Sequence, residues 1–433
     1  MRLRSAMAGA VFSAVLLAPD ARAQRPTVTL AEALRLAEQT QPSMVQAEGQ
    51  VRTSSANVRS AKGAYLPSFS LSGSGNESYS GAGSRVDPTT NQIVGSNWTS
   101  SAGGTLSASW DLFTGFRRRA DVRAANASSQ AAEAGLVDAR YQLRLTTTDQ
   151  FFSALSSAQL VDVRIASVRE AEEQLRAAIA RLRAGTATRA DTLTSRVNLG
   201  SAQLNLATAR SDLAAAEAGL ARLIGRTGRV SAADDSSFYN PSMIDTTTLR
   251  TEALERSPRV QSALASARAA RAAVAAARAA YWPTLTFGAA TGYSGTKGTG
   301  TGFSNNSQLS LRLSWNLFNG FSREAEIVTQ ESSADVADAT ASDDGRVVDV
   351  GITTYLAQLD AASTSIAITQ TSVAAGEENL RVVQERYQLG VATIVDLLTA
   401  QATLDQARVD SLNARFDYLR AKAQLEAIVG RSL

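Results

Sequence analysis

The sequence makes the same strand-to-helix junction twice, as Trp-Asp-Leu-Phe-Thr-Gly-Phe at 110–116 and as Trp-Asn-Leu-Phe-Asn-Gly-Phe at 315–321. In each copy a segment of alternating polar and apolar residues reaches an aromatic-Gly corner and continues into a long helical pattern. A chain of 433 residues could hold two or three ordinary domains, but its only long duplication is one half against the other. The junction therefore predicts one architecture built twice.

The N-terminus has the order of residues of a secretory signal peptide. Arg2 and Arg4 precede an apolar run from Ala6 to Ala18, and Ala21-Arg22-Ala23 provides a small-x-small cleavage site before Gln24. Removing residues 1–23 leaves 40 basic and 39 acidic side chains, a balance that argues against a nucleic-acid partner. The absence of cysteine excludes disulfides and a lipid-bearing cysteine after the signal. No run approaches the ~20 apolar residues of a membrane-spanning helix, so an exported chain of this kind would enter a membrane only as β-structure.

The two repeats are matched by offsets that change once. Pro42 and Pro67 lie 216 residues before Pro258 and Pro283, whereas from Trp110 and Trp315 onward the offset is 205, so one loop is eleven residues shorter in the second copy. The predicted organisation is a first repeat at 24–226 and a second repeat at 249–433, joined by a connector at 227–248. Each repeat comprises a helix, a β-hairpin (about 66–115 and 282–320), a long helix (117–184 and 322–389) and a returning helix (191–226 and 394–429).

The predicted hairpins have one apolar and one polar face, which suits lipid on one side and water on the other. Alternation is strict at 68–72, 105–112, 284–287 and 308–317, and the Gly/Ser/Thr/Asn-rich segments between, roughly 73–104 and 288–307, are expected to be exposed loops. A small soluble sandwich shows the same alternation. The signal peptide and the aromatic residues at the strand ends favour a membrane interface instead, with Trp110, Phe113, Phe116, Trp315, Phe318 and Phe321 as interface aromatics. Four strands cannot close a barrel, so two chains would share eight strands, or three chains twelve.

The helices carry a seven-residue repeat that predicts coiled-coil packing. Val161, Val168, Leu175 and Leu182 match Ile366, Val373, Leu380 and Tyr387. The long helices have 68 residues each, on the order of 100 Å at ~1.5 Å per residue. The shorter ones are about half as long, and stacking 191–226 on 249–281, and 30–64 on 394–429, nearly matches the long ones. A hollow cylinder of long helices beside end-to-end short helices fits these lengths, with the connector outside at mid-height.

These residues resemble the TolC family of outer-membrane efflux proteins over essentially all of the mature chain. The resemblance is carried by the duplicated halves, the Tyr-x-Pro strand entries, the Trp-x-Leu-Phe-x-Gly-Phe corners and the segment from Arg386 to Leu398. It implies a mixed α and β membrane protein: a homotrimer whose twelve-stranded outer-membrane β-barrel continues into a long periplasmic α-helical coiled-coil barrel. The implied partners are outer-membrane lipid, a periplasmic adaptor (membrane fusion protein) and an inner-membrane pump of the RND, ABC or MFS type.

The resemblance also implies roles for residues of the helix-to-helix turns. Gly185, Thr186, Ala187, Gly390, Val391, Ala392 and Thr393 would be tips that touch the adaptor, although each Gly also suits a left-handed helix end. Asp396, Asp191 and Tyr387 would form a periplasmic entrance gate. Both aspartates also complete a capping box with Thr393 and Thr188, which leaves capping alone as an alternative. The family's second ring acid is Thr399 here and a linking arginine falls at Ala392, so any closed-state lock would be built through Arg189 or Arg386.

An enzyme is not expected. The chain has no His, no Cys and no phosphate loop, so no catalytic, cofactor-binding or metal site is predicted, and Arg312 is expected to be solvated in the lumen. The expected function is the exit duct of a tripartite efflux system, passively conducting small molecules from the periplasm. The alternatives are the exit duct of an ABC-transporter-driven protein secretion system and, from another class, a periplasmic coiled-coil scaffold or adhesin without a pore.

Overall fold

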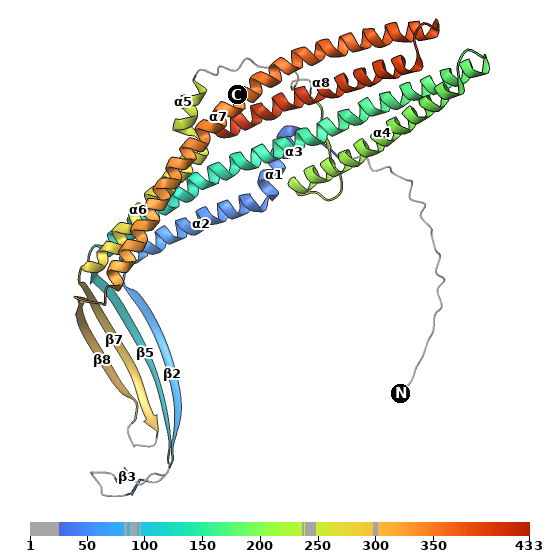
Figure 1. The fold of residues 1–433 in the computed structure, drawn as a ribbon. Coiled ribbons are helices and arrows are strands. Elements are labelled where there is room, and N and C mark those ends of the chain that lie inside the picture. Colours follow the sequence, from blue (N-terminus) through green and yellow to red (C-terminus); the bar gives the residue numbers. More distant parts are fainter. Residues whose placement is uncertain are drawn as a thin grey trace, which may run out of the picture.

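The computed structural model describes residues 26–81, 85–86, 93–94, 97–235, 238, 248–297 and 302–433. The expected signal peptide and half of the connector lie outside these residues. A four-stranded sheet occupies one end of a long molecule, and two helical hairpins reach the other end (Figure 1). Among the described helices, none is both long and apolar enough to cross a membrane.

The helices are α1 (Leu30–Thr40), α2 (Pro42–Gly63), α3 (Arg117–Arg183), α4 (Arg189–Leu223), α5 (Leu249–Arg256), α6 (Pro258–Arg278), α7 (Ser322–Gln388) and α8 (Ile394–Val429), with a 3₁₀ turn η2 (Ala279–Tyr281). The strands are β1 (Thr27–Val28), β2 (Ser68–Ser80), β3 (Arg85–Val86), β4 (Ile93–Val94), β5 (Asn97–Phe113), β6 (Ser231–Ala232), β7 (Thr284–Lys297) and β8 (Ser304–Ser314). The two long helices, α3 and α7, have 67 residues each, which corresponds to about 100 Å.

The sheet is antiparallel in the order β2-β5-β7-β8, so β2 and β8 have unpaired outer edges. Polar and apolar residues alternate along the strands, so the sheet has one apolar and one polar face. Trp110 lies opposite Phe287 on the apolar face. Asp111 lies opposite Thr286 on the polar face, where the Thr286 hydroxyl donates to the Asp111 carboxylate at 2.8 Å. The expected long loops are wrong, because β2 continues to residue 80, β5 begins at 97 and β7 continues to 297. Backbone hydrogen bonding between neighbouring strands outweighs the low strand propensity of Gly and Ser in these segments.

The short helices stack end to end within each repeat. Gln41, the N-cap of α2, donates its side-chain amide to the carbonyl of Leu223 at the end of α4. At the end of α8, a Cβ on Gly430 would lie 2.9 Å from Pro258, the first residue of α6. The expected pairing of 191–226 with 249–281, and of 30–64 with 394–429, is therefore wrong. Length could not decide between the pairings, because all four segments are almost equally long.

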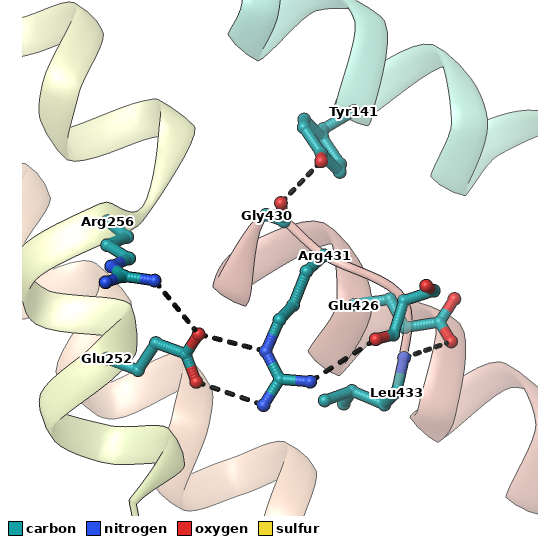
Figure 2. A network of polar contacts seen from close by, with 8 residues as sticks. Tyr141, Glu252, Arg256, Glu426, Gly430, Arg431 and Leu433 are labelled. Carbon is teal, nitrogen blue, oxygen red and sulfur yellow. Dashed lines mark hydrogen bonds and ion pairs between the residues drawn. The ribbon is translucent and has the colours of Figure 1, made fainter.

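Figure 2 shows the polar contacts that fix the α8 junction. The Arg431 guanidinium makes two bonds to the Glu252 carboxylate of α5, at 2.9 and 3.0 Å, and Arg256 lies 3.8 Å from the same carboxylate. The Tyr141 hydroxyl of α3 donates to the Gly430 carbonyl. The C-terminal end of α8 is thus attached to α3 and α5 together.

The largest hydrophobic core lies at mid-height, where the short helices meet. It contains Phe151 and Phe152 of α3, Leu220 of α4, and Phe416 and Leu425 of α8. Val230 of the connector is fully buried there, beside a short parallel pairing of β1 with β6 that the sequence analysis did not predict. The described part of the connector therefore contributes to the core.

The seven-residue repeat is packed differently in its two copies. In α7, Leu380 and Tyr387 are buried in a cluster with Leu397 and Leu404 of α8, with Val373 against it. In α3, Val161 is buried but Leu182 is 37% exposed. The buried positions of α3 beyond Val161 are small or polar: Ser167, Ala171, Gln174 and Ala178. The repeat predicted apolar coiled-coil packing, which α7 shows against α8, but it did not predict the polar surface between α3 and α8.

Candidate functional site

The first candidate site is the pair of helix-to-helix turns at the far end from the sheet. Gly185 follows α3 and Gly390 follows α7, both with φ of 77°, in the left-handed region. The next amide closes each helix end: Thr186 N–H donates to the Arg181 carbonyl at 2.9 Å and Val391 N–H to the Arg386 carbonyl at 2.8 Å. Each glycine therefore ends a helix, as residues with positive φ commonly do.

The two aspartates of the expected gate, Asp191 and Asp396, form the capping boxes that the sequence predicts. Asp191 accepts from the Thr188 backbone N–H at 2.8 Å, and Asp396 accepts from the Thr393 backbone N–H at 2.8 Å. In return, the two threonine hydroxyls accept from the aspartate backbone N–H groups, each at 3.2 Å. The Thr393 backbone N–H lowers the pKa of Asp396, assisted by the Thr393 hydroxyl and the nearby Arg386 cation.

Tyr387 lies behind the second turn with a polar partner that the sequence analysis missed. Arg181 of α3 donates to the Tyr387 carbonyl at 2.6 Å, and its guanidinium carbon lies 4.3 Å from the centre of the Tyr387 ring. Tyr387 is 9% exposed. A closed-state lock through Arg189 or Arg386 stays a prediction, whereas within the chain Arg181 joins α3 to the end of α7. By the 205-residue offset Arg181 is the equivalent of Arg386, but this equivalence does not indicate a contact with Tyr387.

Further along α3, polar side chains form a seam between α3 and α8. The sequence pattern did not predict this seam. Gln174 donates to Gln401 at 2.5 Å, Gln401 donates to Glu170, and Arg408 donates to Glu170 at 3.2 Å. Asp405 lies on the same seam, and burial raises its pKa. The seam holds the α3/α4 hairpin against the α7/α8 hairpin.

The second candidate site is the pair of sheet-to-helix corners. Phe116 and Phe321, the N-caps of α3 and α7, have φ of 67° and 64°, and each follows a glycine with positive φ. The Trp110 indole donates to the Tyr65 carbonyl at 3.1 Å, and the Trp315 indole donates to the Tyr281 carbonyl at 3.2 Å. The two corners therefore share one backbone geometry and one indole hydrogen bond.

An arginine completes each corner. Arg118 lies 4.8 Å from the Tyr65 ring centre and donates to the Leu112 carbonyl at 3.1 Å. Arg323 lies 4.0 Å from the Tyr281 ring centre and donates to the Asn316 carbonyl at 3.2 Å. The sequence pattern had identified the aromatic residues but neither arginine.

The predicted interface aromatics gather around these corners on the apolar side. Phe113 contacts Phe116 edge to face at 5.5 Å, and Phe318 contacts Phe321 in the same way at 5.5 Å. Trp110, Trp315, Phe318 and both corner phenylalanines are exposed in the single chain. Across the described residues, no group of three or more His, Cys, Asp and Glu side chains is arranged to hold a metal ion.

Known proteins share this sequence pattern and this fold. The family model described as "Outer membrane efflux protein" matches residues 33–226 and 249–431, leaving out the connector. Among solved structures, the outer membrane protein VceC from Vibrio cholerae has 20% identity and a TM-score of 0.75, with 93% of this chain and 96% of that chain covered.

A membrane protein from Pseudomonas aeruginosa has 19% identity and a TM-score of 0.79, over 93% of this chain and 90% of that chain. The CmeC outer membrane channel from Campylobacter jejuni has 17% identity and a TM-score of 0.79, over 93% of this chain and 85% of that chain. At these identities the likeness shows the fold. The comparison with curated proteins gives no match.

Proposed function

The chain belongs to the outer membrane efflux protein family, and on that premise we propose that three copies form the exit duct of a tripartite efflux system. Its place is the outer membrane, with the large helical part in the periplasm. The duct passively conducts small molecules, and an inner-membrane pump supplies the energy.

The observation that carries this proposal is the incomplete sheet. Apolar side chains along it are strongly exposed, among them Phe69 and Leu71 on β2 and Leu309, Leu311 and Leu313 on β8. Four strands leave the β2 and β8 edges unpaired, and unpaired backbone groups are not tolerated in lipid. Pairing β8 of one copy with β2 of the next satisfies both edges, and three copies make a twelve-stranded barrel.

The helical part supports a continuous tunnel below that barrel. In the half nearest the sheet, α2 packs on α3, α3 on α6 and α6 on α7, so one chain contributes a curved wall (Figure 1). Copies joined through their sheet edges place α7 of one chain beside α2 of the next. The wall then closes in register with the barrel.

The turns at the far end are the proposed contacts for the periplasmic adaptor. Val391 is 66% exposed and Leu389, beside it, is 79% exposed. The other proposed contacts are Gly185, Thr186 and Ala187 on the first turn and Gly390, Ala392 and Thr393 on the second. An apolar, solvent-facing turn is a surface that a partner protein would cover.

Asp396, Asp191 and Tyr387 are the proposed entrance gate. Three copies of Asp396 converging on one axis would attract cations at the tunnel mouth. Its capping bond with Thr393 holds the carboxylate in its ionised form, because the same bond lowers its pKa. Capping and gating are therefore compatible roles for this side chain.

The test is single-channel conductance of the detergent-extracted oligomer in planar bilayers, after its mass has been measured. We expect a trimer, discrete pores, and block by divalent cations that is weaker in Asp396→Asn. Pores with unchanged block would remove Asp396 from the gate but keep the duct. A folded protein that remains a single chain and forms no pores would refute the duct and favour a scaffold.

A further inference from the structure

The two sheet-to-helix corners share their geometry but differ in charge. Residues 59–62 and 117–123 at the first corner include six basic residues and one acidic residue. The equivalent residues of the second corner, 275–278 and 322–328, include two of each. Because Arg118 and Arg323 alone complete the two corners, the additional positive charge of the first corner is not needed to form it.

We propose that this charge is a binding site for anionic phospholipid headgroups in the inner leaflet of the outer membrane. The site, called the basic collar below, consists of Arg119 and Arg123 on α3 with Arg117 and Lys62 beside them. The proposal rests on the outer-membrane location of the family; only the presence of three collars per assembly rests on the proposed trimer.

The apolar surface of the sheet leads directly to the collar. Phe113 pairs with Leu285 on the apolar face, and its ring lies 5.5 Å from the ring of Phe116. Phe116 in turn contacts Trp282 edge to face at 5.7 Å. The exposed Phe116 therefore continues the surface that would face lipid acyl chains, down to the first residue of α3.

Arg119 and Arg123 are four residues apart in α3, the spacing that places two helical residues on one face, and both are exposed just after Phe116. At ~1.5 Å per residue, they lie roughly 5 and 10 Å below Phe116 along the helix. This is the depth at which headgroup phosphates meet an aromatic belt.

Lys62 and Arg117 flank this face at the same level. Arg118 donates to the Ala64 carbonyl at the end of α2 at 3.4 Å and thereby brings the ends of α2 and α3 together. Arg117 lies 3.6 Å from Asp121, and its side chain is 67% exposed. Asp121 is the single acidic residue of this segment, so the collar keeps a strong positive balance.

A second copy of the chain would not cover the collar. Within one chain α3 is packed on one flank against α2 and on the other against α6, and in the proposed trimer copies join at β2 and β8. Arg119 and Arg123 are exposed in the single chain. They therefore remain exposed after assembly, whereas charges on the outer flanks of α2 and α7 would meet a neighbour.

The second corner provides an internal comparison. The residues equivalent to Arg119 and Arg123 are Glu324 and Val328, and Glu324 is occupied by an ion pair with Arg323 at 2.9 Å. We expect this corner to attract no anionic headgroup. An assembly of three chains would then alternate between lipid-binding and neutral corners around its circumference.

The experiment is native mass spectrometry of the detergent-solubilised protein, titrated with phosphatidylglycerol or with zwitterionic phosphatidylcholine. The wild type should prefer phosphatidylglycerol, and Arg119→Gln/Arg123→Gln should lower that preference about tenfold or more, since each basic group near an anionic surface contributes on the order of fivefold. Arg196→Gln/Arg210→Gln on α4 removes the same charge from exposed positions far from the corner and should change nothing. The preference should also weaken at high salt.

A gain-of-function variant gives the complementary result. Glu324→Arg/Val328→Arg transfers the collar to the second corner and should raise the number of tightly bound phosphatidylglycerol molecules per chain. An unchanged preference in Arg119→Gln/Arg123→Gln, with oligomeric mass and helix content retained, would overturn the proposal. Displacement of the lipid by excess inorganic phosphate would also overturn it, because the collar would then be a small-anion site. Loss of the trimer in the wild type would refute the proposed duct while leaving the lipid count per chain readable.

Discussion

Replacing Gly115 by alanine tests whether the first corner is held by close packing or by turn geometry alone. Gly115 has φ of +61°, and a Cβ there would lie 2.3 Å from the Cβ of Trp282 and 3.2 Å from the Ala279 carbonyl oxygen. Gly320, its equivalent in the second repeat, has φ of +66° and nothing within 4 Å of the same Cβ. The chain thus provides a matched pair with equal backbone strain and unequal space.

The expected magnitudes follow from that difference. Both substitutions place alanine in the left-handed region, which costs about 1–2 kcal/mol. Only Gly115→Ala also forces Trp282 and the start of β7 away from α3, and overpacking of this kind typically costs ~1–3 kcal/mol. Gly320→Ala should therefore lower the free energy of unfolding by about 1–2 kcal/mol, and Gly115→Ala by about 2–5 kcal/mol.

The assay is guanidinium unfolding of the detergent-solubilised protein, followed by circular dichroism of the helices and by tryptophan fluorescence. A double-mutant cycle with Trp282→Gly, which removes the opposing Cβ, should recover the overpacking part of the loss in Gly115→Ala. Equal losses in the two single variants, or no coupling to Trp282, would refute the reasoning. The corner would then be governed by backbone dihedral angles alone.

Three other predictions concern the far half of the helices. Arg181→Met should accelerate amide exchange at 181–188 and 387–393 by about fivefold or more, because a charged hydrogen bond and a cation–π contact together contribute roughly 1–3 kcal/mol. Arg183→Met, at an exposed position, is the control, and equal exchange in both variants would contradict the role of Arg181. Burial raises the pKa of Asp405, so ionised Asp405 opposes folding once the pH rises through that pKa. Asp405→Asn should therefore raise the melting temperature at pH 7, with the gain disappearing toward about pH 4, near the unfolded pKa; a gain confined to low pH would be contradictory. The pKa of Asp396 is lowered by its Thr393 partners, so its contribution to stability is present above the unfolded pKa and is lost as the pH falls through the folded pKa. Protection factors of the amides at 393–398, that is, exchange rates divided into the intrinsic rates at the same pH, should fall below about pH 4 in the wild type, and Asp396→Asn should remove that fall.

Helix ends were accessible to sequence reasoning because their chemistry is local. The sequence placed a long helix at 117–184 and another at 322–389, and the structure has Arg117–Arg183 and Ser322–Gln388. It placed the last helix at 394–429, and the structure has Ile394–Val429. Thr188 and Thr393 form the predicted capping boxes with the aspartates three residues on. Each of these signals lies within one turn of the helix end that it determines.

The ends of the strands were harder to predict from the sequence than the ends of the helices. Small residues such as Gly103, Gly104 and Gly292 have low strand propensity, so composition suggested loops. In the sheet, Gly292 allows close approach of β7 to β5: a Cβ there would lie 2.9 Å from the Thr105 hydroxyl. A glycine that fits between two strands looks in the sequence like a glycine that ends one.

The polar contacts between distant segments were also inaccessible. Arg181 and Tyr387 are 206 residues apart, and Gln174 and Gln401 are 227 apart. Neither pair has a spacing that a local pattern could identify. The same applies to Arg431 and Glu252, which join the end of α8 to α5 (Figure 2).

The repeated corners, the lengths of the long helices and the capped turns follow from local sequence, because backbone geometry and hydrogen bonding at these places depend on neighbouring residues. The stacking of the short helices depends on packing instead, since helices of nearly equal length are interchangeable until Gln41 contacts Leu223 and Gly430 contacts Pro258. The tertiary structure also decided that one of two equivalent corners carries its positive charge on the exposed side of α3. Side chains far apart in sequence acquire a common surface only when packing brings their helices together.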